Sequence, residues 1–133
     1  MKISTKGRYA MRLLIDLNEN QGDGFVALKD IAQRQSISKK YLEQIVPALT
    51  AEGVLKASRG FRLAREPEDI PVGEVLRLTE GSISPVACLD SSPNECPRCT
   101  DCLTLPVWQG LERVINEYLD GVSLRDVLDG NVK

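Results

Sequence analysis

The chain has 133 residues, of which 42% are hydrophobic and 27% charged, and its formal net charge is −2. This composition excludes a disordered chain, and the length suits one domain with a core of its own. The sequence has no histidine, which excludes Ser-His-Asp and Cys-His catalysis and any imidazole metal ligand, so we do not expect an enzyme.

No apolar run is long enough to span a bilayer, and the N-terminus lacks a signal-peptide core. We therefore expect a cytoplasmic protein with no membrane partner. Residues 1–65 hold 12 Lys and Arg against 6 Asp and Glu, a net +6, whereas residues 66–133 hold 5 against 13, a net −8. The basic first half favours a module that binds a polyanion such as DNA, and chance clustering of charge is the alternative.

The first predicted helix lies within residues 1–20, where apolar residues recur at helical spacing and Thr5 is the expected N-cap. Residues 21–24 should end it as a turn, and residues 25–27 are short enough for a small strand.

Residues 30–53 contain two short helical patterns that meet at a polar break over residues 36–38. In the second pattern Leu42, Ile45 and Leu49 fall on one helical face and should point inward. Ser38 is placed to cap this second helix. Pro47 lies inside it and should kink it or loosen the turn near Glu43.

The opposite face of the second helix carries long polar side chains. They are Lys39, Lys40, Glu43 and Gln44. In a helix-turn-helix, side chains at these positions reach base edges in the major groove of DNA. An ordinary helical hairpin with a solvated outer face fits the same pattern.

Residues 54–58 and 61–65 predict two strands joined at Arg59-Gly60. Such a β-hairpin, or wing, can bring a basic tip to phosphate or to the minor groove, and Arg59 is the candidate contact. A surface hairpin with solvated arginines is the alternative.

A helix is predicted from Pro71 to Glu80, and a long helix after Pro106. Apolar residues on the long helix recur at spacings of 4, 3 and 4. They are Val107, Leu111, Val114 and Tyr118, reinforced by Ile115, Leu119 and Val122. This seam favours pairing with the same helix of a second chain, and a two-fold dimer would set two recognition helices about 34–36 Å apart, one turn of DNA. Residues 123–129 predict a last short helix.

All four cysteines fall within fifteen residues, in the pattern C-x7-C-x2-C-x2-C. They are Cys88, Cys96, Cys99 and Cys102. Thiolates this close on an irregular loop can converge on one soft metal centre, and the last three match the start of a ferredoxin-type run. An iron–sulfur cluster, a structural zinc ion and thiol redox chemistry all remain open on spacing alone.

Several motifs resemble a known family. They are the opening Met-Lys-Ile-Ser-Thr-Lys-Gly-Arg-Tyr-Ala, the run Tyr41-Leu42-Glu43-Gln44, Ser58-Arg59-Gly60, Glu80-Gly81-Ser82-Ile83-Ser84-Pro85, and Cys102-Leu103-Thr104 with Trp108. Together they resemble the bacterial winged-helix transcription regulators of the IscR, NsrR and CymR family. The resemblance implies homodimers that cross two long C-terminal helices. Many members sense iron–sulfur, nitric oxide or redox status through a cluster held by three cysteines, whereas CymR-like members lack the cysteines and control cysteine metabolism with a partner protein.

The resemblance implies a mainly α fold with a small β wing. A winged helix-turn-helix DNA-binding domain would occupy residues 1–80, a cysteine-rich cluster-binding loop residues 81–104, and a dimerisation helix with a short C-terminal helix residues 105–133. By family match and by face, Ser38, Lys40, Glu43 and Gln44 are the recognition-helix contacts. Lys39 and Arg8 should contact phosphate, and Arg59 belongs to the wing.

Cys88, Cys96 and Cys102 match the family's three cysteine ligands. The fourth ligand of IscR, a histidine, falls at Leu105 here, and the acidic ligand of NsrR-like members falls at Arg8. Our hypothesis is therefore that Cys99 completes a four-thiolate site within one chain.

The wing departs from the family pattern Arg-Gly-Pro-x-Gly-Gly-Tyr, because Arg59-Gly60 runs directly into Phe61. Either the wing is short, or its tip is missing from the chain as given.

The resulting interpretation is a homodimeric repressor that binds a palindromic double-stranded operator under control of a 2Fe–2S or 4Fe–4S cluster. The alternative is the same fold with structural zinc, or with no metal and CymR-like thiol control.

Overall fold

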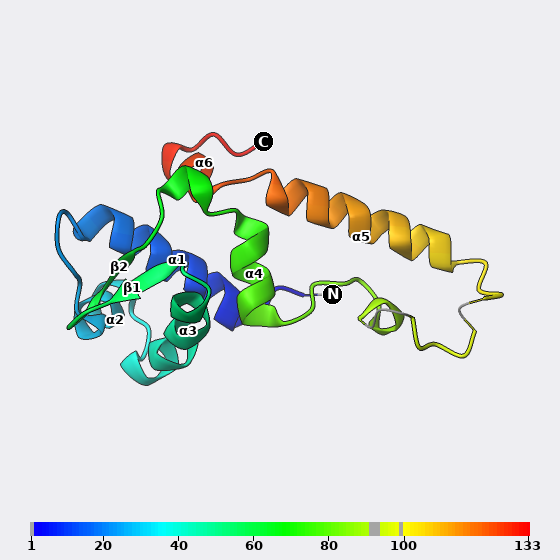
Figure 1. Ribbon diagram of the computed structural model, residues 1–133, viewed down its shortest axis with the longest axis horizontal. Coiled ribbons are helices and arrows are strands. Elements are labelled where there is room, and N and C mark those ends of the chain that lie inside the picture. The colour runs from blue at the N-terminus through cyan, green and yellow to red at the C-terminus, as the bar shows by residue number, and fades with distance from the viewer. Residues whose placement is uncertain (1, 91–93, 99) are drawn as a thin grey trace.

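The computed structural model describes residues 2–90, 94–98 and 100–133 of the chain (Figure 1). Its helices are α1 (Thr5–Asn20), α2 (Leu28–Gln35), α3 (Lys39–Ala51), α4 (Val72–Glu80), α5 (Leu105–Asp120) and α6 (Leu124–Asp129), with short 3-10 turns η1 (Pro67–Asp69) and η2 (Ala87–Leu89). Its strands are β1 (Leu55–Ala57) and β2 (Phe61–Leu63). The prediction of a mainly α fold with a small β wing is confirmed.

Side-chain caps fix the ends of the helices. Ser38 caps α3 as predicted, because its hydroxyl oxygen accepts a hydrogen bond from the backbone N–H of Tyr41 at 2.9 Å. Thr5 was the wrong residue for the cap of α1, since Ser4 holds that position and Thr5 is already helical. Pro47 lies inside α3, and the helix continues past it to Ala51 without a break.

The hydrophobic core lies among α1, α2, α3 and α4. Its fully buried large side chains include Leu13, Leu14, Leu17, Ile31, Leu42, Ile45, Leu49 and Val75. The inward face predicted for α3 is therefore confirmed. Leu124 of α6 is also fully buried in this core, so the last helix packs against the N-terminal part of the chain.

A buried carboxylate fixes α2 to α1. Asp16 is 1% exposed, and the guanidinium of Arg34 donates two hydrogen bonds to it at 2.7 and 3.0 Å, while the side-chain amide of Gln35 donates a third at 3.0 Å. Burial raises the pKa of Asp16, but these hydrogen bonds and the charge of Arg34 outweigh burial and hold the pKa below its ordinary value. The contact sets the end of α2 where the helix-turn-helix bends.

We expect Asp16→Asn to lower the free energy of unfolding at pH 7 by about 2 kcal/mol, because hydrogen bonds from a guanidinium to a charged acceptor become hydrogen bonds to a neutral one. The lowered pKa means that the carboxylate stabilises the fold fully above the ordinary aspartate pKa, and that this stabilisation is lost as the pH falls through the folded-state pKa. Urea unfolding at pH 7 and in acid measures both effects. The deficit of the variant should shrink in acid, and a deficit of equal size at both pH values would contradict the assignment. Asp23→Asn, on the exposed turn after α1, is the matched control.

The wing is an antiparallel hairpin. Its facing residue pairs are Leu55–Leu63, Lys56–Arg62 and Ala57–Phe61. The small strand expected at residues 25–27 is reduced to one bridge, in which Val26 and Phe61 exchange two backbone hydrogen bonds of 2.8 Å. This bridge fixes the wing against the loop that precedes α2.

Arg65 holds the base of the wing. Its guanidinium donates to the carboxylate of Glu74 at 2.7 and 2.8 Å and to the backbone carbonyls of Glu52 and Gly53 at 3.0 and 3.3 Å. The Arg65 side chain therefore connects α4 to the end of α3.

Helix α5 extends away from the body formed by the first four helices (Figure 1). Residues 100–104 lead directly into its far end. Its near end is fixed to α4, because Arg77 contacts Asp120 at 2.7 Å and Asn116 at 3.2 Å. Backbone hydrogen bonds of 2.8 Å from Val72 to Val122 and from Leu124 to Ile70 secure the connection to α6. No residue of α5 is buried in the single chain.

Candidate nucleic-acid interface and cysteine loop

The two faces of α3 differ as the sequence predicts. Its apolar face is buried in the core, and the candidate DNA contacts are all exposed to solvent. These contacts are Ser38, Lys39, Lys40, Glu43 and Gln44. Lys39 and Glu43 lie one turn apart and form an ion pair of 3.7 Å with both side chains more than half exposed. Such a pair is weak and breaks at little cost when either group meets a better partner.

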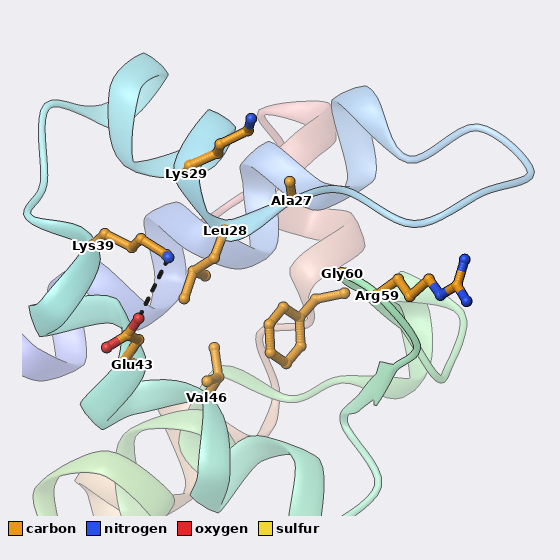
Figure 2. A pocket seen from close by; sticks show the side chains of 9 residues that line it. Ala27, Leu28, Lys29, Lys39, Glu43, Val46, Arg59 and Gly60 are labelled. Atoms are coloured by element: carbon orange, nitrogen blue, oxygen red, sulfur yellow. Dashed lines mark ion pairs between the residues drawn. The ribbon is translucent and has the colours of Figure 1, made fainter.

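A hollow of about 420 Å³ separates α3 from the wing tip (Figure 2). Its lining comes from the start of α2, from α3 and from the wing. These residues are Ala27, Leu28, Lys29, Lys39, Glu43, Val46, Arg59, Gly60 and Phe61. The structure therefore places Lys39, Glu43 and Arg59 in the lining of one groove between α3 and the wing, with the Arg59 side chain directed away from its centre (Figure 2).

Lys29 also lines this groove, and sequence reasoning missed it. Its position in the second residue of α2 gives no periodic signal, and only the fold shows that α2 begins beside the recognition helix. Arg8 lies apart from the groove, exposed on α1, where its guanidinium donates to the hydroxyl of Thr5 at 3.2 Å.

Arg59 forms the wing tip in an unusual backbone conformation. Its φ is +54°, a left-handed value that costs a non-glycine residue of order 1 kcal/mol or more. Gly60 follows at φ +142°, and a Cβ there would come within 2.9 Å of the carbonyl oxygen of Val26. The tip therefore needs glycine at position 60, whereas an arginine at position 59 is strained.

The cysteines lie on the loop between α4 and α5. Cys88 is in η2, Cys96 follows the gap in the described residues, and Cys102 lies three residues before α5; all three are half-buried free thiols. Cys99 lies outside the described residues. Among residues 2–90, 94–98 and 100–133, no group of three or more Cys, Asp or Glu is arranged to hold a metal ion.

Cys102 lies just before the start of α5. Its sulfur is 3.4 Å from the hydroxyl of Thr104. Hydrogen bonds from the Thr104 side chain and backbone, then from the backbone of Leu105, together with the charge of Arg98, lower the pKa of Cys102. The thiolate is the form that binds metals, so this position suits a ligand.

Comparison with known proteins identifies the family. The model of the Rrf2 family, described as an iron-dependent transcriptional regulator, matches residues 3–130. The chain belongs to the Rrf2 family. Its relatives include the rrf2 protein of Nitratidesulfovibrio vulgaris, 39% identical over 96% of this chain and 87% of the relative.

Two solved structures of Rrf2-family regulators show the same fold. One is CymR of B. subtilis, described as its global cysteine regulator, with 36% identity, a TM-score of 0.76 and coverage of 97% of both chains. The other is IscR of T. potens, with 36% identity, a TM-score of 0.75 and coverage of 98% of this chain and 88% of that chain.

The chain is thus a DNA-binding transcription regulator with a winged-helix fold, and it is not an enzyme. None of the helices in the described part of the chain has the length and apolar character to cross a membrane.

Proposed function

We propose that the protein is a homodimeric repressor that binds a palindromic operator, with an affinity set by an iron–sulfur cluster on the cysteine loop. The observation that carries this proposal is the arrangement of α5. The helix extends from the DNA-binding body with an apolar seam open to solvent (Figure 1), and Cys102 lies three residues before its first residue.

The seam supports the dimer. Val107, Leu111, Val114 and Tyr118 are 59%, 41%, 56% and 50% exposed in the single chain. A continuous apolar stripe of this kind marks an interaction surface, and heptad-like spacing suits a second copy of the same helix. A two-fold axis through paired α5 helices makes the dimer symmetric, so its operator would be an inverted repeat.

The exposed face of α3 supports base reading. The carboxylate of Glu43 can accept from the N4 amino group of cytosine, and the amide of Gln44 can pair with adenine. Ser38 and Lys40 flank them on the same face, whereas Lys39 and Arg8 would contact phosphate. Phosphate contacts place the protein, and the base contacts would specify the sequence.

The donor chemistry of the loop fits an iron–sulfur cluster. Four thiols within fifteen residues offer a complete thiolate set, with Cys88, Cys96 and Cys102 as ligands and Cys99 as the fourth. A bound cluster would supply sensitivity to iron, oxidants or nitric oxide. The chain's own part is to order residues 81–104 around the thiolates, and a change in that order would shift α5 and the paired recognition helices.

The second candidate function is the same DNA-binding dimer without an iron–sulfur cluster. Its cysteines would then either hold a structural zinc ion or act as redox-sensitive thiols. Its support is that Cys88, Cys96 and Cys102 are free, half-buried thiols, together with the lowered pKa of Cys102. Both candidates share the dimer and the DNA-binding groove, and they differ only at the cysteines.

Selection of binding sites from random duplex DNA, with anaerobically purified protein and iron and sulfide assays on the same sample, tests the proposal. We expect an inverted repeat, and iron with sulfide in comparable amounts. Direct repeats or single half-sites would contradict the two-fold dimer, and protein with zinc and no sulfide would select the second candidate.

The strained Arg59 gives a prediction with two opposed effects. Arg59→Gly should raise the free energy of unfolding by about 1 kcal/mol, because glycine adopts positive φ without penalty. The same change should weaken DNA binding by about tenfold, because the wing tip loses its cation. Urea unfolding and duplex titration measure the two effects. Lys56→Ala on β1 is the control for loss of one wing charge, and unchanged DNA affinity in Arg59→Gly would remove Arg59 from the interface.

A further inference from the structure

Residues 80–84, which we call the bridge, connect the DNA-binding part of the chain to α5. At one end Glu80, the last residue of α4, accepts hydrogen bonds from the backbone N–H and the hydroxyl of Ser4 at 2.9 and 2.7 Å. At the other end the hydroxyl of Ser84 donates to the carboxylate of Glu112 on α5 at 2.6 Å. Only three residues, 81–83, therefore separate a contact with the N-cap of α1 from a contact with α5.

The contact between Glu80 and α1 is closely fitted. Ser4 is the N-cap of α1, so the Glu80 carboxylate lies at the positive end of the helix dipole. Gly7 is buried directly beneath the carboxylate, and a Cβ at position 7 would overlap its Oε1 atom. Glu80 thus fixes the first turn of α1 with a charge and two hydrogen bonds, and Gly7 leaves room for its carboxylate.

Helix α1 is in turn bonded to the helix-turn-helix. The ring of Tyr9 meets the ring of Tyr41 in α3 edge-on, with centroids 5.5 Å apart. The guanidinium of Arg12 donates to the side chain of Gln35 at 3.1 Å and also to its backbone carbonyl. With the Asp16 contacts described above, α1 holds both the turn before the recognition helix and its first residues.

The middle of the bridge contacts the part of the cysteine loop that contains Cys88. The hydroxyl of Ser82 donates a hydrogen bond to the carboxylate of Asp90. Asp90 is the C-cap residue of η2, and η2 contains Cys88. Ile83 lines an apolar hollow of about 220 Å³ together with Ile3 and the α5 residue Ile115. A change in the loop or in α5 therefore acts directly on residues 82–84.

We propose that Glu80 is a positioning residue that transmits the state of the cysteine loop and α5 to the recognition helix through Ser4 and α1. The sensing step rests on the proposed function, in which a cluster sets the conformation of the cysteine loop. The mechanical connection between α5 and the recognition helix does not depend on a cluster.

The first test compares operator affinity of anaerobic cluster-loaded and cluster-free protein in wild type, Glu80→Ala and Glu80→Gln. The ratio of the two affinities should fall at least about fivefold in Glu80→Ala, and less in Glu80→Gln, whose amide oxygen can still accept from Ser4. Glu19→Ala, an equal charge change at the exposed end of α1, should leave the ratio unchanged. Circular dichroism confirms that each variant is folded. An unaltered ratio in Glu80→Ala would overturn the inference.

The second test is a double-mutant cycle in cluster-free protein. Glu112→Gln weakens the contact between the bridge and α5, and it should change operator affinity in the wild-type background but not in Glu80→Ala. Glu117→Gln, exposed on the same helix, is the control. Additive effects would overturn the inference. If wild type binds its operator equally with and without the cluster, the proposed regulation by the cluster is wrong. The double-mutant cycle alone then decides whether the bridge couples α5 to the recognition helix.

Discussion

Replacement of Leu111 with aspartate should convert the protein to a monomer and weaken operator binding by at least about a hundredfold, because a dimer joins two half-site contacts in one complex. Leu111 lies in the middle of the exposed seam of α5, at 41% exposure in the single chain. A carboxylate there would face its own copy across the two-fold axis, and burying two like charges in an apolar seam is strongly unfavourable. Sedimentation analysis gives the mass, and titration with an operator duplex gives the affinity.

Val132→Asp provides the matched control. Val132 is an exposed apolar residue, at 47%, in the C-terminal tail outside α5. We expect this variant to remain dimeric and to bind the operator as wild type does. A Leu111→Asp protein that stays dimeric with unchanged affinity would show that the seam of α5 is not the subunit interface.

If the proposed iron–sulfur cluster is bound by the cysteines, their replacement by serine should remove it. Cys102→Ser is expected to abolish the visible absorption of anaerobically purified protein and to reduce its iron and sulfide to background, because a serine hydroxyl is a poor ligand for iron. Cys99→Ser should have the same effect if four thiolates of one chain hold the cluster. Thr100→Ser, a neighbouring change that removes no thiol, should leave the spectrum intact.

The stability of these variants separates ligand loss from unfolding. None of the three described cysteines belongs to the buried core, so thermal unfolding of cluster-free wild type and Cys102→Ser should coincide. Full absorption in Cys99→Ser would refute Cys99 as the fourth ligand. A colourless wild-type protein that retains stoichiometric zinc would contradict the cluster proposal itself.

The local elements follow from sequence patterns because their causes are local. The spacing of Leu42, Ile45 and Leu49 predicts the buried face of α3, and the Ser38 cap follows from one hydroxyl and one nearby N–H. The cap of α1 was placed one residue late, because Ser4 and Thr5 carry equivalent hydroxyls and only the backbone decides between them.

Contacts between distant residues do not follow from patterns. Glu80 and Ser4 are 76 positions apart, and a Glu followed by Gly at a helix end gives no sign that its carboxylate accepts hydrogen bonds from the N-cap of another helix. The same holds for Lys29, which lines the groove between α3 and the wing only because α2 starts beside α3. The burial of Leu124 depends likewise on the return of α6 to the core.

For the candidate sites too, the sequence predicts the local features but not how the fold brings them together. The exposed polar face of α3 and the wing tip were predicted as separate features, and the fold places them around one groove. The density of thiols indicates a soft metal centre, but convergence of the thiols is a property of loop conformation. The role of Cys99, outside the described residues, stays a prediction.

Control of DNA binding by the cluster is the central claim, and one titration tests it most directly. Anaerobically purified protein is divided in two, the cluster is removed from one half, and both halves are titrated with the same operator duplex at the same salt concentration. We predict affinities that differ by at least about tenfold, a coupling in the usual range for regulators. Equal affinities for the two dimeric forms would contradict the claim.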